Sequence, residues 1–148
     1  MSRLTILDKK RIKQINGLIK KQWGSDFDLT DYVVFANPKN KLFIINRDVD
    51  RLDFRKLRIN SLGLYFGEIK NRELRLSVEG AQFVAETADK NILNLNKKQA
   101  KQWMSGQDFE IDSELEGFAI IKYEEDILGC GKLVRGKLLN YVPKERRI

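Results

Sequence analysis

Apolar residues near the start of the chain recur every three or four positions, with lysines between them. The series is Leu4, Leu7, Ile12, Ile15, Leu18, Ile19 and Trp23. This spacing puts the apolar side chains on one face, so it predicts an amphipathic helix over residues 5–22, with Gly24 as its stop. A basic helix of this kind can lie on a membrane or pack on a protein core, and we favour the core.

Short β-rich runs follow this helix. Residues 32–35 and 42–45 are joined by Asn37-Pro38-Lys39-Asn40, so they predict a hairpin. Residues 48–56 predict a short helix. Residues 61–69 predict a strand that contains two glycines, which mark bends or a close backbone approach.

A second helix is expected after another extended segment, residues 73–76. Ser77 is a favourable N-cap for a helix over residues 78–88. The apolar side chains of this helix can form a buried face. We expect the domain boundary after this helix, between Ala88 and Asn91.

The second half of the chain starts with a short strand over residues 92–95. Asn96 can cap a helix over residues 97–105, and Gly106 closes it. Positions three and four apart are neighbours on a helix. The spacing therefore directs Ala100, Trp103 and Met104 to the core and gathers Lys97, Lys98 and Lys101 on the other face.

The remaining elements are short strands. The pattern predicts them over residues 109–112, 118–123, 127–134 and 138–142, and Pro143 ends the last one. Gly129 and Gly131 interrupt the third of these strands, and we interpret them as bends.

Residue counts restrict the chemistry of this 148-residue chain. It has one cysteine, Cys130, and no histidine. These counts exclude a structural zinc site of four Cys or His ligands and any catalytic arrangement that needs an imidazole. A lone cysteine fits a reducing compartment. No apolar run reaches the length that spans a membrane, and the N-terminus has no secretory pattern, so we expect a cytoplasmic protein.

Charge is unevenly distributed along the sequence. The net charge is +7, which favours a polyanionic partner. Residues 1–24 hold seven Lys or Arg and one acidic residue. Residues 129–148 hold six Lys or Arg and one acidic residue. Residues 108–126 hold eight acidic residues and one lysine. Either the signs are segregated onto different faces, which we favour, or folding interleaves them.

Two short motifs in the second half resemble a known RNA-binding module. They are Gly106-Gln107-Asp108-Phe109, directly after the short helix, and Leu128-Gly129-Cys130-Gly131. With the order strand, helix, glycine, strands and basic end, they resemble a PUA domain over residues 91–148. The resemblance implies an α+β fold, with an N-terminal pre-PUA-like α/β domain over residues 1–89 and a C-terminal PUA pseudo-β-barrel.

Two PUA-containing relatives resemble other parts of the chain. Residues 61–67 and 74–77 are similar to the junction before the PUA domain in an archaeal and eukaryotic large-subunit ribosome-biogenesis factor. Residues 140–147 resemble the tail of Sun-type RNA cytosine-5 methyltransferases. Both relatives act on ribosomal or transfer RNA, and the sequence leaves the choice between them open.

The PUA resemblance also implies where RNA binds. In PUA domains RNA lies against the short helix, the glycine loop after it and the late strands. The matching residues here are Lys97, Lys98, Lys101, Gly106, Gln107, Lys132, Arg135, Lys137, Lys144, Arg146 and Arg147. Lysine and arginine neutralise phosphates, so this assignment is physically reasonable. The acidic residues 108–126 are expected on the opposite side.

These observations favour a non-catalytic RNA-binding protein that acts in rRNA or tRNA maturation or ribosome biogenesis. We expect no cofactor, no metal and no membrane partner. Cys130 lies between two glycines rather than beside a proline, unlike a methyltransferase nucleophile, which argues against an enzyme. The alternative is an interaction adaptor whose N-terminal domain docks an RNA-processing or modification protein.

Overall fold

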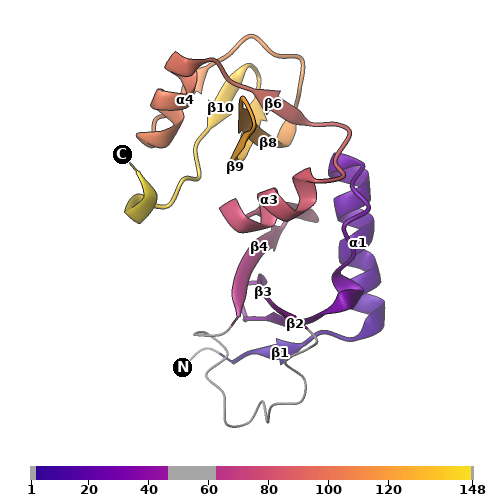
Figure 1. The fold of residues 1–148 in the computed structure, drawn as a ribbon. Coiled ribbons are helices and arrows are strands. Elements are labelled where there is room, and N and C mark those ends of the chain that lie inside the picture. Colours follow the sequence, from indigo (N-terminus) through magenta and orange to yellow (C-terminus); the bar gives the residue numbers. More distant parts are fainter. Residues whose placement is uncertain (1–2, 47–62, 148) are drawn as a thin grey trace.

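The computed structural model describes residues 3–46 and 63–147. It contains two five-stranded sheets, and the helices α1, α3 and α4 pack on them (Figure 1). The α+β class expected from the sequence is confirmed. The predicted helix over residues 48–56 and the start of the predicted strand at Ser61 lie outside the described residues. No helix in the described ranges is long and apolar enough to cross a membrane.

Helix α1 spans Lys9–Trp23, so the prediction that it starts at residue 5 was wrong. Asp8 caps it by accepting a 2.8 Å hydrogen bond from the Arg11 amide. The residues before this cap form strand β1, Thr5–Ile6, which pairs with β2. Gly24 ends the helix in a left-handed conformation, as predicted.

The N-terminal sheet follows the order of the sequence, β1-β2-β3-β4-β5. A short 3₁₀ turn, Leu29–Asp31, leads into β2, Tyr32–Ala36, which pairs antiparallel with β3, Lys41–Asn46. This is the predicted hairpin. Strands β4, Leu64–Lys70, and β5, Glu73–Leu76, complete the sheet.

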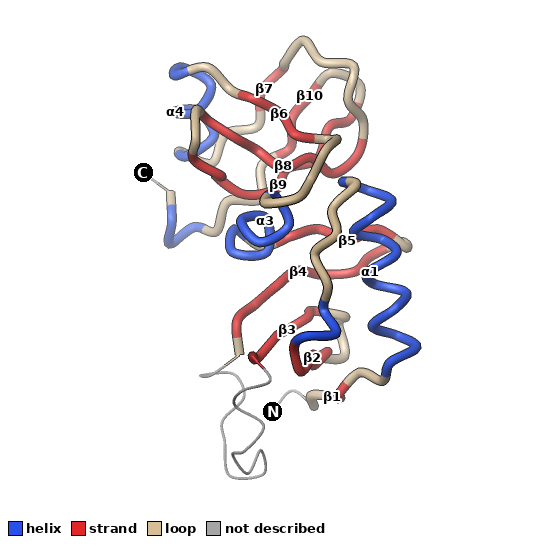
Figure 2. The backbone as a smooth tube through the Cα atoms, turned by 45° about the vertical axis from the view of Figure 1, so that its right-hand side comes forward, coloured by secondary structure: helices blue, strands red, loops and turns tan. Residues whose placement is uncertain are grey.

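Helix α3 spans Val78–Ala85 and is shorter than predicted. Ser77 caps it as expected: its hydroxyl accepts from the Gly80 amide at 2.9 Å and donates to the Tyr65 carbonyl at 2.6 Å. Helix α3 lies between the two sheets and contacts both β4 and β9 (Figure 2). It therefore connects the halves of the molecule.

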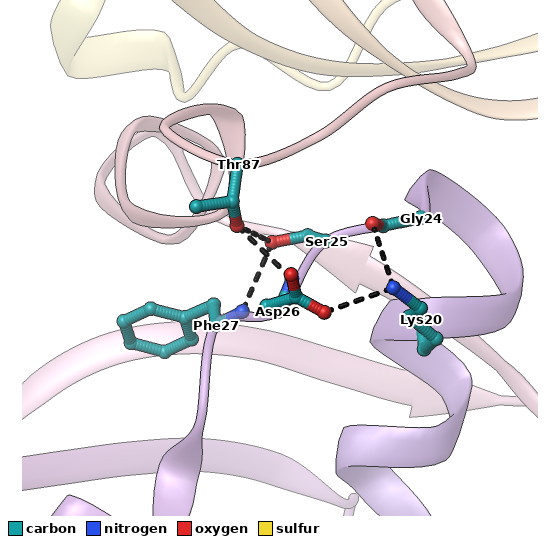
Figure 3. A network of polar contacts seen from close by, with 6 residues as sticks. All are labelled: Lys20, Gly24, Ser25, Asp26, Phe27 and Thr87. Atoms are coloured by element: carbon teal, nitrogen blue, oxygen red, sulfur yellow. Dashed lines mark hydrogen bonds and ion pairs between the residues drawn. The ribbon is translucent and has the colours of Figure 1, made fainter.

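The segments after α1 and after α3 are joined by polar contacts (Figure 3). The Ser25 and Thr87 hydroxyl oxygens lie 2.7 Å apart, and Thr87 also accepts from the Asp26 amide at 3.0 Å. Lys20 forms a 2.8 Å ion pair with Asp26. The Asp89 amide then donates to the Trp23 carbonyl at 2.9 Å. The segment at the predicted domain boundary is therefore held against the end of α1.

The C-terminal sheet has the order β6-β8-β9-β10-β7, so neighbours in space are not neighbours in sequence. Strand β6, Ile92–Asn94, pairs parallel with β8, Gly117–Tyr123. Its other strands are antiparallel: β9, β10 and β7 span Asp126–Val134, Lys137–Leu139 and Phe109–Glu110. Helix α4, Lys97–Met104, follows β6, and a 3₁₀ turn at Lys144–Arg146 ends the chain.

Strand β8 belongs to two apolar cores. Its Ile120 packs into the core of the N-terminal half, whereas Ala119 and Ile121 pack around Trp103. Cys130 of β9 also joins the first core. A strand buried on both faces reads as a continuous apolar run rather than an alternating one. The two halves therefore share buried surface.

The two glycines of β9 have different roles, and one differs from the prediction. Gly129 has a φ of 141° and lies next to a bulge in β9, where Leu128 is the extra residue opposite β8, so it marks an irregularity as expected. Gly131 instead makes room: a Cβ there would lie 2.7 Å from the Trp103 ring and 2.9 Å from Leu138. Close packing of the tryptophan, rather than a bend, explains this glycine.

Candidate nucleic-acid interface

Helix α4 presents three exposed lysines, Lys97, Lys98 and Lys101, on the face predicted for them. Its other face buries Ala100 and Trp103. The helix is fixed by a capping box. The Asn96 side-chain oxygen accepts from the Gln99 amide at 2.8 Å, and the Gln99 side-chain oxygen accepts from the Asn96 amide at 2.9 Å. The lysines therefore project from a well-defined frame.

These lysines are unfavourable for the helix itself. Lys97 and Lys98 occupy its first turn, which contains no acidic residue. The N-terminus of a helix carries partial positive charge, and like charges four residues apart, such as Lys97 and Lys101, repel. An anion bound here would relieve both effects.

The loop after α4 adjoins the end of the chain. Gly106 has a φ of 88°, and a Cβ at this position would lie 2.6 Å from Cδ of Arg147. The Arg147 Nε donates to the Val142 carbonyl at 3.1 Å, which fixes the side chain there. Glycine therefore allows a guanidinium from the tail to lie against the α4 loop.

Asn140 holds these two segments together, and the sequence reasoning did not assign it a role. Its side-chain amide donates to the carbonyls of Trp103 and Gln107 at 2.8 and 2.9 Å. Its side-chain oxygen accepts from the Val142 amide at 2.8 Å. The only sequence signal was its place in the basic ending, which does not indicate a partner more than 30 residues away.

The structure thus gathers part of the predicted site. Helix α4 carries the three lysines, and the loop with Gly106 and Gln107 meets Arg147. Lys144 is exposed at the start of the terminal 3₁₀ turn.

Arg146 and Lys132 lie elsewhere, at the junction of the two halves. Arg146 forms an ion pair with Glu79 of α3. The Lys132 Nζ lies 3.7 Å from a carboxylate oxygen of Glu73 in β5 and 5.1 Å from the centre of the Phe118 ring. Both cations have a local carboxylate partner, so each is partly neutralised within the protein.

Arg135 and Lys137 belong to the β9–β10 hairpin. Arg135 lies in its turn with a φ of 50°, and Lys137 is the cross-strand partner of Glu110 in β7. Both side chains are exposed. Lys137 and Glu110 share one face of the sheet, because directly paired residues do so.

The acidic residues 108–126 do not all lie on the side opposite to the basic ones, which corrects the expectation. Glu110 is paired with Lys137. Asp108 accepts from the Asn140 amide at 2.7 Å, beside the α4 loop. The Leu95 amide donates to the Lys122 carbonyl at 2.7 Å, which places the acidic β8–β9 turn at the end of the sheet where α4 starts. Folding interleaves the charges here.

Cys130 is buried and makes no disulfide. Burial raises the pKa of its thiol from 9.0 to about 12. The group is therefore a neutral thiol at physiological pH and a poor nucleophile. Among the described residues, no group of three or more His, Cys, Asp or Glu could hold a metal ion.

Residues 90–148 match the family model of the methyltransferase RsmF PUA domain. This match supports a PUA domain in this part of the chain. It resembles the tail of Sun-type methyltransferases, the second of the two resemblances found in the sequence. The structure accordingly shows α4, its glycine loop and the terminal tail of this PUA domain packed together.

Curated relatives extend the similarity beyond the PUA domain. The ribosomal RNA small subunit methyltransferase F of Aliivibrio fischeri is 26% identical over 121 residues, covering 82% of this chain and 24% of the relative. The enzyme of the same name from Vibrio vulnificus is 23% identical over 140 residues, covering 93% of this chain and 29% of the relative. The enzyme of Aeromonas salmonicida is 30% identical over 91 residues, covering 61% of this chain and 19% of the relative. The chain spans about a quarter of the length of the first two of these relatives.

Proposed function

We propose that this chain is a non-catalytic RNA-binding protein of the cytoplasm that acts in rRNA maturation through its PUA domain. The observation that carries the proposal is the set of exposed lysines on α4, inside the matched PUA region and on the helix that precedes the Gly106–Arg147 contact. Lysine clusters of this kind bind phosphates and release counterions. The names of the relatives, ribosomal RNA small subunit methyltransferases, point to small-subunit ribosomal RNA as the first RNA to test.

The state of the single thiol favours binding without catalysis. This thiol, that of Cys130, is buried and stays protonated well above neutral pH. The proposal therefore assigns RNA recognition, rather than thiol chemistry, to the described part of the chain.

The test is a binding titration of the purified chain with transcribed fragments of small-subunit rRNA at low salt. We expect a Kd of about 1 μM or lower, which is tighter binding than is typical of non-specific sites. The triple variant Lys97→Glu/Lys98→Glu/Lys101→Glu should bind at least about tenfold more weakly, since three phosphate contacts become repulsive.

A matched variant separates charge from folding. Lys97→Arg/Lys98→Arg/Lys101→Arg changes the same positions but keeps their charge, so its affinity should stay within about threefold of the parent. Equal affinity of the parent and the Glu variant would remove α4 from the interface. Partners that survive RNase treatment in a pull-down, together with no RNA binding, would favour the adaptor hypothesis instead.

A further inference from the structure

The N-terminal half has a concave basic surface outside the PUA domain. It encloses about 650 Å³ between α1, the β2–β3 turn and the β4–β5 turn. Its cations are Arg11, Lys39, Lys70 and Arg72, and Glu68 is the one carboxylate among its described lining residues. We call this surface the basic groove.

The cations of the basic groove lack carboxylate partners. Glu68 is already neutralised by Arg75, at 2.9 Å. Within residues 3–46 and 63–147, none of the four groove cations forms a side-chain ion pair, and the Arg11 guanidinium donates to the neutral Gln14 side chain at 3.0 Å. A concave surface lined by one sign of charge concentrates ions of the opposite sign. The basic groove is therefore complementary to an anion.

Arg72 occupies a backbone position that disfavours it. Asn71 and Arg72 form the β4–β5 turn with φ values of 53° and 63°, so both central residues are left-handed. Hairpin turns with this geometry prefer glycine at the second central position. An arginine there is strained compared with glycine, so the requirements of the turn do not explain its side chain.

The first turn of α1 gives a second, independent sign of the same kind. It contains Lys9, Lys10 and Arg11 and no acidic residue. Cations at a helix N-terminus face the positive end of the helix dipole, and here three of them stand against the one carboxylate of the N-cap, Asp8. Arg11 lines the basic groove from this turn. A bound anion would offset the repulsion.

The two turns that complete the groove are held in register. The Ile69 amide donates to the Asn40 carbonyl at 3.0 Å, which links the β2–β3 turn to β4. Asn37 accepts from the Lys39 and Lys41 amides at 2.9 Å each, which fixes the turn that carries Lys39. The cations therefore project from ordered backbone.

We propose that the basic groove binds the phosphodiester backbone of the same RNA that the PUA domain contacts. This inference rests on the proposed RNA-binding function and adds a second site to it. The described lining residues offer charged groups and side-chain amides but no aromatic ring for base stacking. Contacts of this type position an RNA without reading its sequence. The two halves of the chain thus hold one RNA at two places.

The test compares two double variants of the full chain. Lys39→Gln/Lys70→Gln removes two groove charges. Lys21→Gln/Lys90→Gln removes two charges from exposed lysines that line neither the groove nor α4. The probe is a transcribed fragment of small-subunit rRNA, and Kd is measured at several salt concentrations.

The groove variant should bind about tenfold more weakly at low salt. The slope of log Kd against log salt concentration should fall by about 1.5, because each lost phosphate contact lowers this slope by roughly 0.7 to 0.9. The control variant should change Kd by less than about twofold. Equal Kd and salt slope in the two variants would overturn the groove proposal while leaving RNA binding by the PUA domain intact.

Arg72→Gly separates binding from stability. Glycine relieves the left-handed strain, so Tm should stay the same or rise, whereas RNA affinity should fall about threefold or more. Unchanged affinity would remove Arg72 from the site. If the parent chain binds no rRNA fragment at all, the proposed function and the groove proposal both fail.

Discussion

The two five-stranded sheets of this chain are connected in different ways. In the N-terminal sheet each strand pairs with the next one in sequence. In the C-terminal sheet the parallel pair of β6 and β8 and the pairing of β7 with β10 join distant segments. Each half nevertheless buries one tryptophan completely, Trp23 or Trp103. Different connectivities are thus each compatible with a fully buried tryptophan.

The same contrast applies to the two basic surfaces. The basic groove is formed by one helix and two hairpin turns, and its cations have no described carboxylate partner. The PUA surface depends on contacts between α4, its loop and the end of the chain, through Asn140 and Arg147. Its acidic neighbours, such as Asp108, are interleaved with it. We therefore expect the PUA surface to be more sensitive to changes in tertiary structure than the groove.

The largest expected effect is that of truncating the buried tryptophans. Trp103→Ala and Trp23→Ala should each lower the free energy of unfolding by about 3–5 kcal/mol, as is usual for a buried tryptophan. Because Ile120 and Cys130 join the N-terminal core, both variants should unfold in a single transition in urea. Two separate transitions in either variant would show that the halves unfold independently.

Gly131→Ala tests the tight packing around Trp103 without removing the ring. The new Cβ would lie 2.7 Å from the indole and 2.9 Å from Leu138. Overpacking of this kind should lower the free energy of unfolding by about 1–3 kcal/mol. Urea denaturation measures the change, and a value below about 0.5 kcal/mol would contradict the close approach.

Stability at high pH tests the burial of Cys130 at the boundary between the cores. Between pH 9 and 12 the unfolded chain releases the thiol proton and the folded chain keeps it, because burial raises the pKa to about 12. The free energy of unfolding should fall as pH rises, by up to about 1.4 kcal/mol per pH unit from this group. Cys130→Ala should have a shallower slope over that range, and an unchanged slope would contradict the burial.

The smallest effect is expected at Gly17 on the exposed side of α1. A Cβ there would meet nothing within 4 Å. Gly17→Ala should therefore raise the free energy of unfolding by about 0.5–1 kcal/mol, since alanine restricts the unfolded chain and favours the helix. A loss of stability, measured in the same urea series as Gly131→Ala, would mean that α1 packs differently.

Local signals in the sequence predicted most of the elements. Apolar spacing and the caps at Ser77 and Asn96 located the helices, and the turn chemistry at Asn37-Pro38-Lys39-Asn40 located the first hairpin. Asp8 was missed as a cap, so α1 was started too early and β1 was read as helix. Periodicity cannot distinguish a two-residue strand from the first turn of a helix.

Pairing between distant segments could not be predicted. The α4 lysines followed from helical spacing alone, and the structure places them as expected. Asn140 and the basic groove were missed because their partners lie far away in the sequence. The expected segregation of charge was wrong at Glu110 for a related reason, since its pairing with Lys137 depends on a strand order that the residue pattern does not encode.

RNA recognition by the PUA surface can be tested by an NMR titration of the labelled chain with a small-subunit rRNA fragment. We expect backbone amide signals to shift in α4, at Gly106 and Gln107 and at Arg147. Weaker shifts are expected at Lys39 and Arg72 in the basic groove. Shifts confined to other surfaces, or none at RNA concentrations above 100 μM, would contradict RNA recognition by this PUA domain, since even non-specific sites bind with Kd values of about 1–100 μM.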